Sequence, residues 1–142
     1  MQEWALWALA SAVFAALTAI FAKVGLEGVD SNFATFIRTL IIAAALILFL
    51  TYAKKWQPLG ELGARNWVFL TLSGLATGAS WLAYFKALQI GSASQVAPID
   101  KLSVVLVVVF AVIFLGERPS FREWIGIALI ASGVFTLVFA DK

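Results

Sequence analysis

Five long apolar segments, separated by short polar connections, constrain this sequence more than any other feature. They run over about residues 4–24, 32–52, 66–88, 93–115 and 122–139. A helix rises 1.5 Å per residue, so about 20 apolar residues cross the roughly 30 Å hydrocarbon core of a membrane. Stretches such as 40–49 and 104–114 are apolar on every side and lack the alternating polarity of membrane β-strands. We therefore predict an all-α integral membrane protein, a bundle of five transmembrane helices.

The composition agrees with a membrane location. Hydrophobic residues make up 63% of the 142 residues and charged residues 13%, whereas a soluble domain carries about 25% charged residues. The N-terminal Met1-Gln2-Glu3 lacks the basic region and small-residue cleavage site of a signal peptide. We therefore expect the first apolar segment to remain as a span in a multi-pass protein of a bacterial or archaeal cell membrane.

Missing residue types exclude several kinds of chemistry. The chain has no Cys and no His, which excludes disulfides, thiol catalysis, haem ligation by His and the commonest general base. It also has no nucleotide-binding loop and no pair of carboxylates within one span. We therefore expect no enzyme activity, no catalytic residue, no metal site and no cofactor. The net charge of +2 is too small and too scattered for nucleic-acid binding.

Turn formers and capping residues predict where the helices end. Gly116-Glu117-Arg118-Pro119-Ser120 combines a glycine, two charges and a proline, a pattern that stops a helix. Ser120 is the expected N-cap of the last span, and Ser31 or Asn32 that of the second.

Small residues recur at helical spacing in two of the spans. Gly74 and Gly78 stand four residues apart in the third span, and Gly126 and Gly133 share one face of the last. Such positions allow helix backbones to approach closely. They predict packing within the chain or, mainly for the last span, between two copies.

Asp100 and Lys101 lie side by side inside the fourth apolar segment, just after Pro98. A charge at such depth costs about 2.5–3.5 kcal/mol on insertion scales, so it seldom persists unless it is paired or functional. The second and fourth segments start at the same membrane surface, which places Arg38, Asp100 and Lys101 about 9–12 Å below it. We predict an Arg38–Asp100 ion pair, because the depths match and a guanidinium can bind a carboxylate through two hydrogen bonds.

Arg38, Asp100 and Lys101, with Lys23 and Lys86 closer to the surface, form a layer of charged residues that we call the charged layer. It has two interpretations. Lys23 and Lys86 end the first and third spans near the same surface, so the layer could fix only the register of the helices. Alternatively, it forms a substrate or proton site. Pro98 favours the second interpretation, because it removes a backbone hydrogen bond at Ser94, and transporters use such broken helices to bind ligands.

Polar and aromatic residues form a stripe along the third span. Ser73, Thr77, Ser80, Trp81 and Tyr84 recur at helical spacing. The Trp81 indole either stacks on a cationic or aromatic substrate or is a core aromatic whose N–H is hydrogen-bonded. The sequence does not decide between these two interpretations of Trp81.

The basic residues give only a weak bias in orientation. Five lie on the side of the N-terminus, and four lie near the opposite surface. They are Lys54, Lys55, Arg65, Arg118 and Arg122 against Lys23, Arg38, Lys86 and Lys142. The positive-inside rule slightly favours a cytoplasmic N-terminus. Dual topology, in which copies insert both ways, is the alternative.

Several short motifs together resemble one membrane protein family. They are Phe21-Ala22-Lys23, Arg38, Ser73-Gly74-Leu75, Tyr84-Phe85-Lys86-Ala87-Leu88, Ala97-Pro98, Leu115-Gly116-Glu117-Arg118 and the segment 126–133. This pattern resembles the EamA-like family of the drug/metabolite transporter superfamily, in its short single-domain form. The resemblance implies that residues 1–142 form one domain, half of a ten-helix inverted-repeat transporter. A single copy would then act as a homodimer, with an antiparallel arrangement as one option.

The family resemblance and the charged layer together predict a small-molecule transporter that works by alternating access. Protons are one candidate coupling ion. The expected partners are a small metabolite or drug, the lipid bilayer and a second copy of the chain. The expected substrate-binding residues are Arg38, Ser80, Trp81, Tyr84, Asp100 and Lys101. The alternative is a non-transporting membrane subunit or scaffold in which the charged layer only fixes helix packing.

Overall fold

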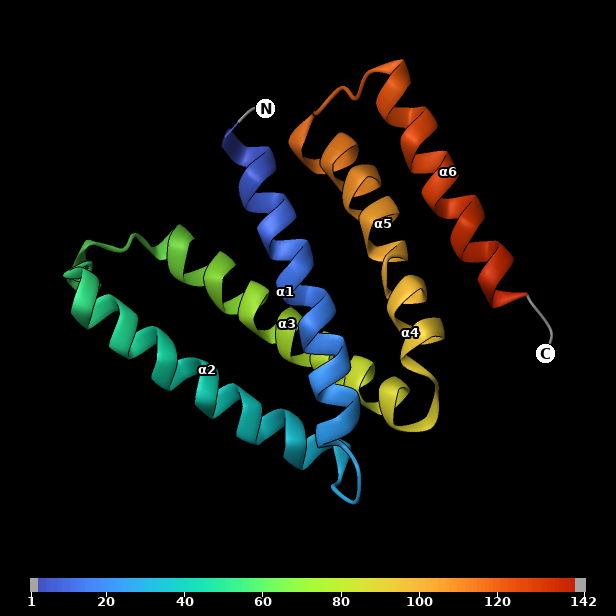
Figure 1. The fold of residues 1–142 in the computed structure, drawn as a ribbon. Helices are drawn as coiled ribbons and strands as arrows, with labels where there is room; N and C mark the ends of the chain where they lie inside the picture. Colours follow the sequence, from blue (N-terminus) through green and yellow to red (C-terminus); the bar gives the residue numbers. More distant parts are fainter. Residues whose placement is uncertain (1–2, 140–142) are drawn as a thin grey trace. The chain divides into compact units, whose positions relative to one another are not determined.

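A computed structural model describes residues 3–139, and within that range the chain is helical with no strand. Figure 1 shows the order of the elements. They are α1 (Glu3–Gly25), α2 (Ser31–Ala53), η1 (Leu59–Glu61), α3 (Ala64–Ile90), α4 (Ala93–Asp100), α5 (Leu102–Phe110), η2 (Ala111–Leu115) and α6 (Phe121–Val138). Among the described residues, five helical segments are long and apolar enough to cross a membrane, with α4, α5 and η2 together making the fourth. The predicted five-helix membrane fold is confirmed. Lys142 and the Met1-Gln2 end lie outside the described residues.

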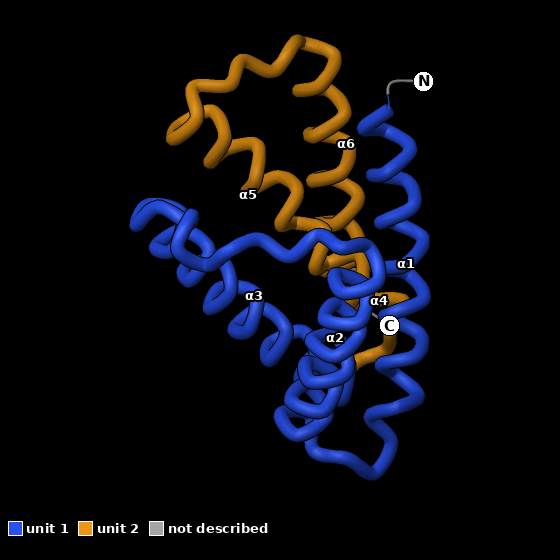
Figure 2. Tube along the Cα trace, turned by 90° about the vertical axis from the view of Figure 1, so that its left-hand side faces the viewer, with its two compact units in different colours: residues 1–90 blue, residues 91–142 orange. Residues whose placement is uncertain are grey.

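The helices group into two compact units, residues 1–90 and 91–142, which Figure 2 colours separately. In the first unit α1 and α2 each pack on α3, which is therefore the central helix of that unit. The buried apolar side chains of this unit are those of Ala19, Leu26, Phe85 and Leu88. Since two of these four belong to the last turns of α3, that end of the helix is where packing is tightest.

In the second unit α4 and α5 both pack on α6. The fourth span is not one continuous helix. It passes through Pro98, ends at Asp100, and starts again at Leu102. At the break the Lys101 amide donates to the Pro98 carbonyl at 3.0 Å, and the Lys101 carbonyl accepts from Val104 at 3.0 Å. These short-range hydrogen bonds replace the regular helical ladder at Lys101.

The helix starts confirm one capping prediction and correct another. Ser120 caps α6: its hydroxyl accepts from the Glu123 amide at 3.4 Å, and the Glu123 carboxylate accepts from the Ser120 amide at 2.6 Å. The N-cap of α2 is Asp30, not Ser31 or Asn32. Its carboxylate accepts from the amides of Asn32 and Phe33 at 2.9 and 3.1 Å. The aspartate was overlooked because the serine and asparagine that follow it are equally good caps by residue type.

The predicted stop at Gly116 is present. The fourth span ends in the wide turn η2, and the amides of Gly116 and Glu117 both donate to the Ala111 carbonyl. Gly116 has a φ of 68°, in the left-handed region that glycine adopts without a steric cost.

The helical glycines make no close contacts. A Cβ added at Gly74, Gly78, Gly126 or Gly133 would meet nothing within 4 Å. These positions therefore take no part in tight helix packing inside their units. A contact between two copies at these faces stays a prediction.

Candidate functional site

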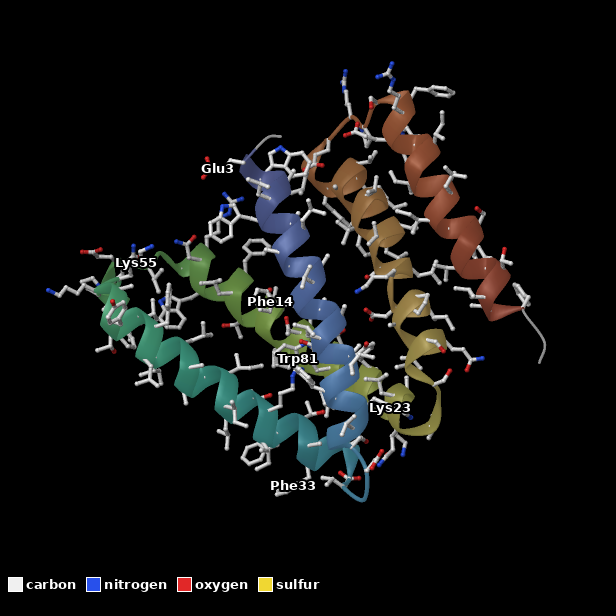
Figure 3. All side chains as sticks on the ribbon, viewed as in Figure 1. Glu3, Phe14, Lys23, Phe33, Lys55 and Trp81 are labelled. Carbon is white, nitrogen blue, oxygen red and sulfur yellow. The ribbon has the colours of Figure 1, made fainter. Side chains whose placement is uncertain are left out.

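Arg38 and Trp81, two of the predicted site residues, come together in the first unit. The guanidinium carbon of Arg38 lies 4.4 Å from the centroid of the Trp81 ring and 5.1 Å from that of Phe85. A cation over aromatic faces is attracted by about 0.5–2 kcal/mol, depending on how far it is desolvated. Figure 3 shows Trp81 on α3, with Lys23 and Phe33 nearer the end of the unit that holds the α1–α2 turn.

Beside Arg38 lies a cavity of about 710 Å³, formed within the first unit. Its lining comes mainly from α1 and α2, including Thr18, Phe21, Ile37 and Arg38, and Phe85 of α3 contributes as well. The cavity exists because α1 and α2 each pack on α3 and leave a groove between themselves. Of the described residues that line it, Arg38 alone is charged.

Tyr84, another member of the predicted third-span stripe, also interacts electrostatically with Arg38. Thr77 donates its hydroxyl to the backbone carbonyl of Ser73 at 2.9 Å, a hydrogen bond within α3. Ser80 is exposed. The Tyr84 ring meets its neighbour Phe85 edge-on, at 6.3 Å between centroids. Within the first unit, Trp81 therefore lies against the Arg38 guanidinium, and Tyr84 interacts with it electrostatically.

Asp100 and Lys101 pair with each other at the break in the fourth span. The Lys101 ammonium lies 3.3 Å from the Asp100 carboxylate, and both side chains are partly exposed. Neighbouring residues of a regular helix point about 100° apart, but Lys101 occupies the turn rather than a helical position, and the turn allows the pair. Arg38 lies in the first unit and Asp100 in the second, so the Arg38–Asp100 ion pair stays a prediction.

Lys23 has a role that sequence reasoning missed. Its ammonium donates to the Leu88 carbonyl at 2.6 Å, in the last turn of α3, where helix carbonyls lack partners in the helix and the dipole is negative. Nearby, the side-chain amide of Gln89 donates through its nitrogen to the Val29 carbonyl at 3.0 Å, and its oxygen accepts from the Lys86 ammonium at 3.2 Å. We call these five residues the polar clasp. It ties α3 to α1 and to the α1–α2 turn.

Comparison with known proteins gives a consistent result. The model of the EamA-like transporter family matches residues 2–139. The chain belongs to the EamA-like transporter family. This confirms the resemblance seen in the motifs and makes the chain a multi-pass membrane protein of the cell membrane.

Two relatives carry transporter names. One, from Sinorhizobium sp., is described as an uncharacterized transporter in the cobO 3' region; it is 54% identical over 136 residues, covering 96% of each chain. The other, from Bacillus subtilis, is described as the uncharacterized transporter YxxF; it is 28% identical over 135 residues. That match covers 94% of this chain but 42% of YxxF. No solved structure matches the chain.

The candidate site of this EamA-like protein also includes a residue that carries no polar signal. Phe85 touches Arg38 and lines the cavity, yet it stands in a helix that is apolar on most sides. Depth alone could have indicated Trp81. It lies nine residues before the end of α3, or about 13 Å, and Arg38 lies about 10 Å into α2.

Among residues 3–139 no group of three acidic residues is placed to hold a metal.

Replacing Lys23 by methionine is expected to destabilise the EamA-like fold by about 1.5–3 kcal/mol, the usual contribution of a hydrogen bond to a charged group. Methionine keeps the length and apolar stem of lysine but leaves the Leu88 carbonyl without this donor. Thermal unfolding in detergent, followed by the helical circular dichroism signal, measures the loss. Lys86→Met is the matched control, because Lys86 is exposed and bonds only to the side chain of Gln89 in the clasp. Equal melting temperatures for the two variants would show that the Lys23 bond contributes nothing.

Proposed function

We propose that this chain is a small-molecule transporter that acts as a homodimer by alternating access, with protons as the coupling ion. Residues 1–142 would form one transmembrane domain, and two copies would enclose the pathway. Family membership and two relatives with transporter names support this proposal. The chain aligns with 42% of YxxF, as expected if longer relatives carry more than one such unit.

The observation that carries the proposal is the break in the fourth span. Asp100 and Lys101 stand where the helix is interrupted, deep in an apolar segment. Secondary transporters place substrate and coupling-ion sites at discontinuous helices near the middle of the membrane. Charged residues inside spans are expensive and commonly mark a transport path. We propose Asp100 as the proton carrier and Lys101 as an anchor for an anionic or zwitterionic group.

The first unit would supply the other substrate contacts. Arg38 lines the cavity between α1 and α2 and lies against the Trp81 ring, and Ser80 and Tyr84 lie on the same helix as Trp81. We propose all four as residues of the transport path.

Two observations support the homodimer. The match to the Sinorhizobium relative covers 96% of that protein, so the relative has about the same length as this chain. The glycine faces of α3 and α6 have no neighbour within 4 Å and are open to a second copy. The near-even distribution of basic residues allows an antiparallel pair as well as a parallel one.

A non-transporting scaffold is the second candidate. One observation favours it: Lys101 already pairs with Asp100 within the same span, as a purely structural pair would. A scaffold predicts that variants of Asp100 and Lys101 lose assembly. A transporter predicts that they assemble normally and lose ligand-dependent activity.

The test is reconstitution in proteoliposomes on a solid-supported membrane. Charge movement is recorded for a panel of amino acids, organic carboxylates, organic cations and sugars, with and without a pH gradient. We expect a saturable current for one class that grows with the gradient, and a dimeric mass in detergent. Labelling tags at each terminus from both sides of the vesicle then separates dual from single topology. If the protein assembles but no compound gives a current, the scaffold is the better account.

A further inference from the structure

The groove between α1 and α2 combines an apolar lining with a single cation. Its volume of about 710 Å³ falls in the range of about 300–1,000 Å³ that is typical of small-molecule sites. Aromatic and aliphatic side chains such as Phe21, Ile37 and Phe85 make most of its wall, and Thr18 adds a hydroxyl. A mostly apolar pocket with one fixed charge selects a ligand with an apolar body and one opposite charge.

Arg38 is held in position but has no anion. The Trp81 and Phe85 rings lie against its guanidinium, at 4.4 and 5.1 Å. Within residues 3–90, no carboxylate pairs with it and no oxygen accepts a hydrogen bond from it. A guanidinium presents five N–H donors and binds a carboxylate through two of them at once. The two rings therefore orient a donor fork whose natural partner is absent from this unit.

The depth of Arg38 decides between two sources of such an anion. Arg38 follows seven residues after the start of α2, which places it about 10 Å below that end of the span. An anionic lipid keeps its head group at the membrane surface and would have to pull it well into the hydrocarbon region. A small organic acid has no such restriction and can enter the groove whole.

We propose that the α1–α2 groove binds a soluble organic carboxylate with an aromatic or other compact apolar body, whose carboxylate pairs with Arg38. The proposal deepens the proposed transport function by naming a substrate class for the first unit. It rests on that function only in treating the bound carboxylate as a transported substrate. The groove itself is a binding site whether or not transport follows.

Binding of radiolabelled 2-naphthoate tests the proposal, measured by scintillation proximity on the full-length protein in nanodiscs of neutral phosphatidylcholine. We expect saturable binding of 2-naphthoate and none of 2-naphthylmethylammonium, which has the same body and the opposite charge. Arg38→Gln should weaken binding roughly 10- to 100-fold, since it removes a charged hydrogen-bonded pair. Arg38→Lys should fall between, because lysine keeps the charge but loses the planar fork.

Two further variants separate the groove from the rest of the protein. Arg65→Gln is the matched control: Arg65 also lies over an aromatic ring of this unit, Phe69 at 5.9 Å, but it does not line the cavity. It should leave binding unchanged. Ala34→Phe fills the groove while keeping Arg38 and should also abolish binding. Each variant is checked for wild-type helix content and elution volume before use.

Three results would overturn the proposal. They are undiminished binding by both Arg38→Gln and Ala34→Phe, equal binding of the naphthyl cation, and loss of naphthoate binding when phosphatidylglycerol is added to the nanodisc. The last would assign the groove to a lipid anion. The readout is independent of transport. Naphthoate binding without any current would count against the proposed function alone, whereas panel currents without naphthoate binding would count against the groove alone.

Discussion

Asp100→Asn should reduce proton-driven transport to the level of protein-free vesicles while leaving the proposed dimer and the helices intact. Asparagine keeps the shape and hydrogen-bonding capacity of aspartate but cannot take up a proton. The Asp100 carboxylate lies 3.3 Å from the Lys101 ammonium, and 35% of its side chain is exposed. Protonation would end the ion pair and release Lys101 for an anionic group of the substrate.

The measurement is the pH-gradient-dependent current in proteoliposomes, for the panel compound that gives the largest wild-type signal. Glu117→Gln is the matched control, because Glu117 is a carboxylate of the same unit that lies in the connection between η2 and α6. It should transport normally. Coupled transport by Asp100→Asn at the wild-type rate would remove Asp100 from the role of proton carrier. Loss of the dimer in this variant would instead support the scaffold.

The spans could be predicted from the sequence because their cause is local. A run of about 20 apolar residues has to be helical in a membrane, since no water is present to satisfy the backbone. The stop at Gly116 and the cap at Ser120 depend on side chains within a few residues of the helix end, so they were also predictable. The cap at Asp30 was missed because Ser31 and Asn32 are equally good caps by residue type. Pro98 indicated a broken helix but not that the break would fall at Lys101.

The partners of Arg38 could not be predicted in the same way. Depth along a helix follows from residue number, but the direction of a side chain around the helix does not. Helices that are apolar on all sides give no signal for which face is inward. Trp81, Phe85 and Asp100 all suit Arg38 by depth or chemistry, and the structure assigns the first two within its unit. The bond from Lys23 to Leu88 joins positions 65 residues apart and has no local signature.

Phe85→Ala should destabilise the protein by about 3–5 kcal/mol, the usual range for a buried phenylalanine. The Phe85 side chain is 2% exposed and lies at the end of α3 where the first unit packs most tightly. Removing the ring leaves a void in that core, takes away part of the wall of the α1–α2 groove, and removes one of the two rings that hold Arg38. Helix association in membranes depends mainly on such packing contacts, because lipid tails supply no hydrophobic force between helices.

Phe69→Ala is the control that isolates burial from residue type. Phe69 belongs to the same helix, and 61% of its side chain is exposed, so lipid or detergent can take the place of the lost ring. It should change stability by less than about 0.5 kcal/mol, as surface substitutions usually do. Unfolding by sodium dodecyl sulfate, followed by circular dichroism, compares both variants with the wild type. Equal losses at Phe85 and Phe69 would mean that the end of α3 is covered by lipid in the membrane rather than by α1 and α2.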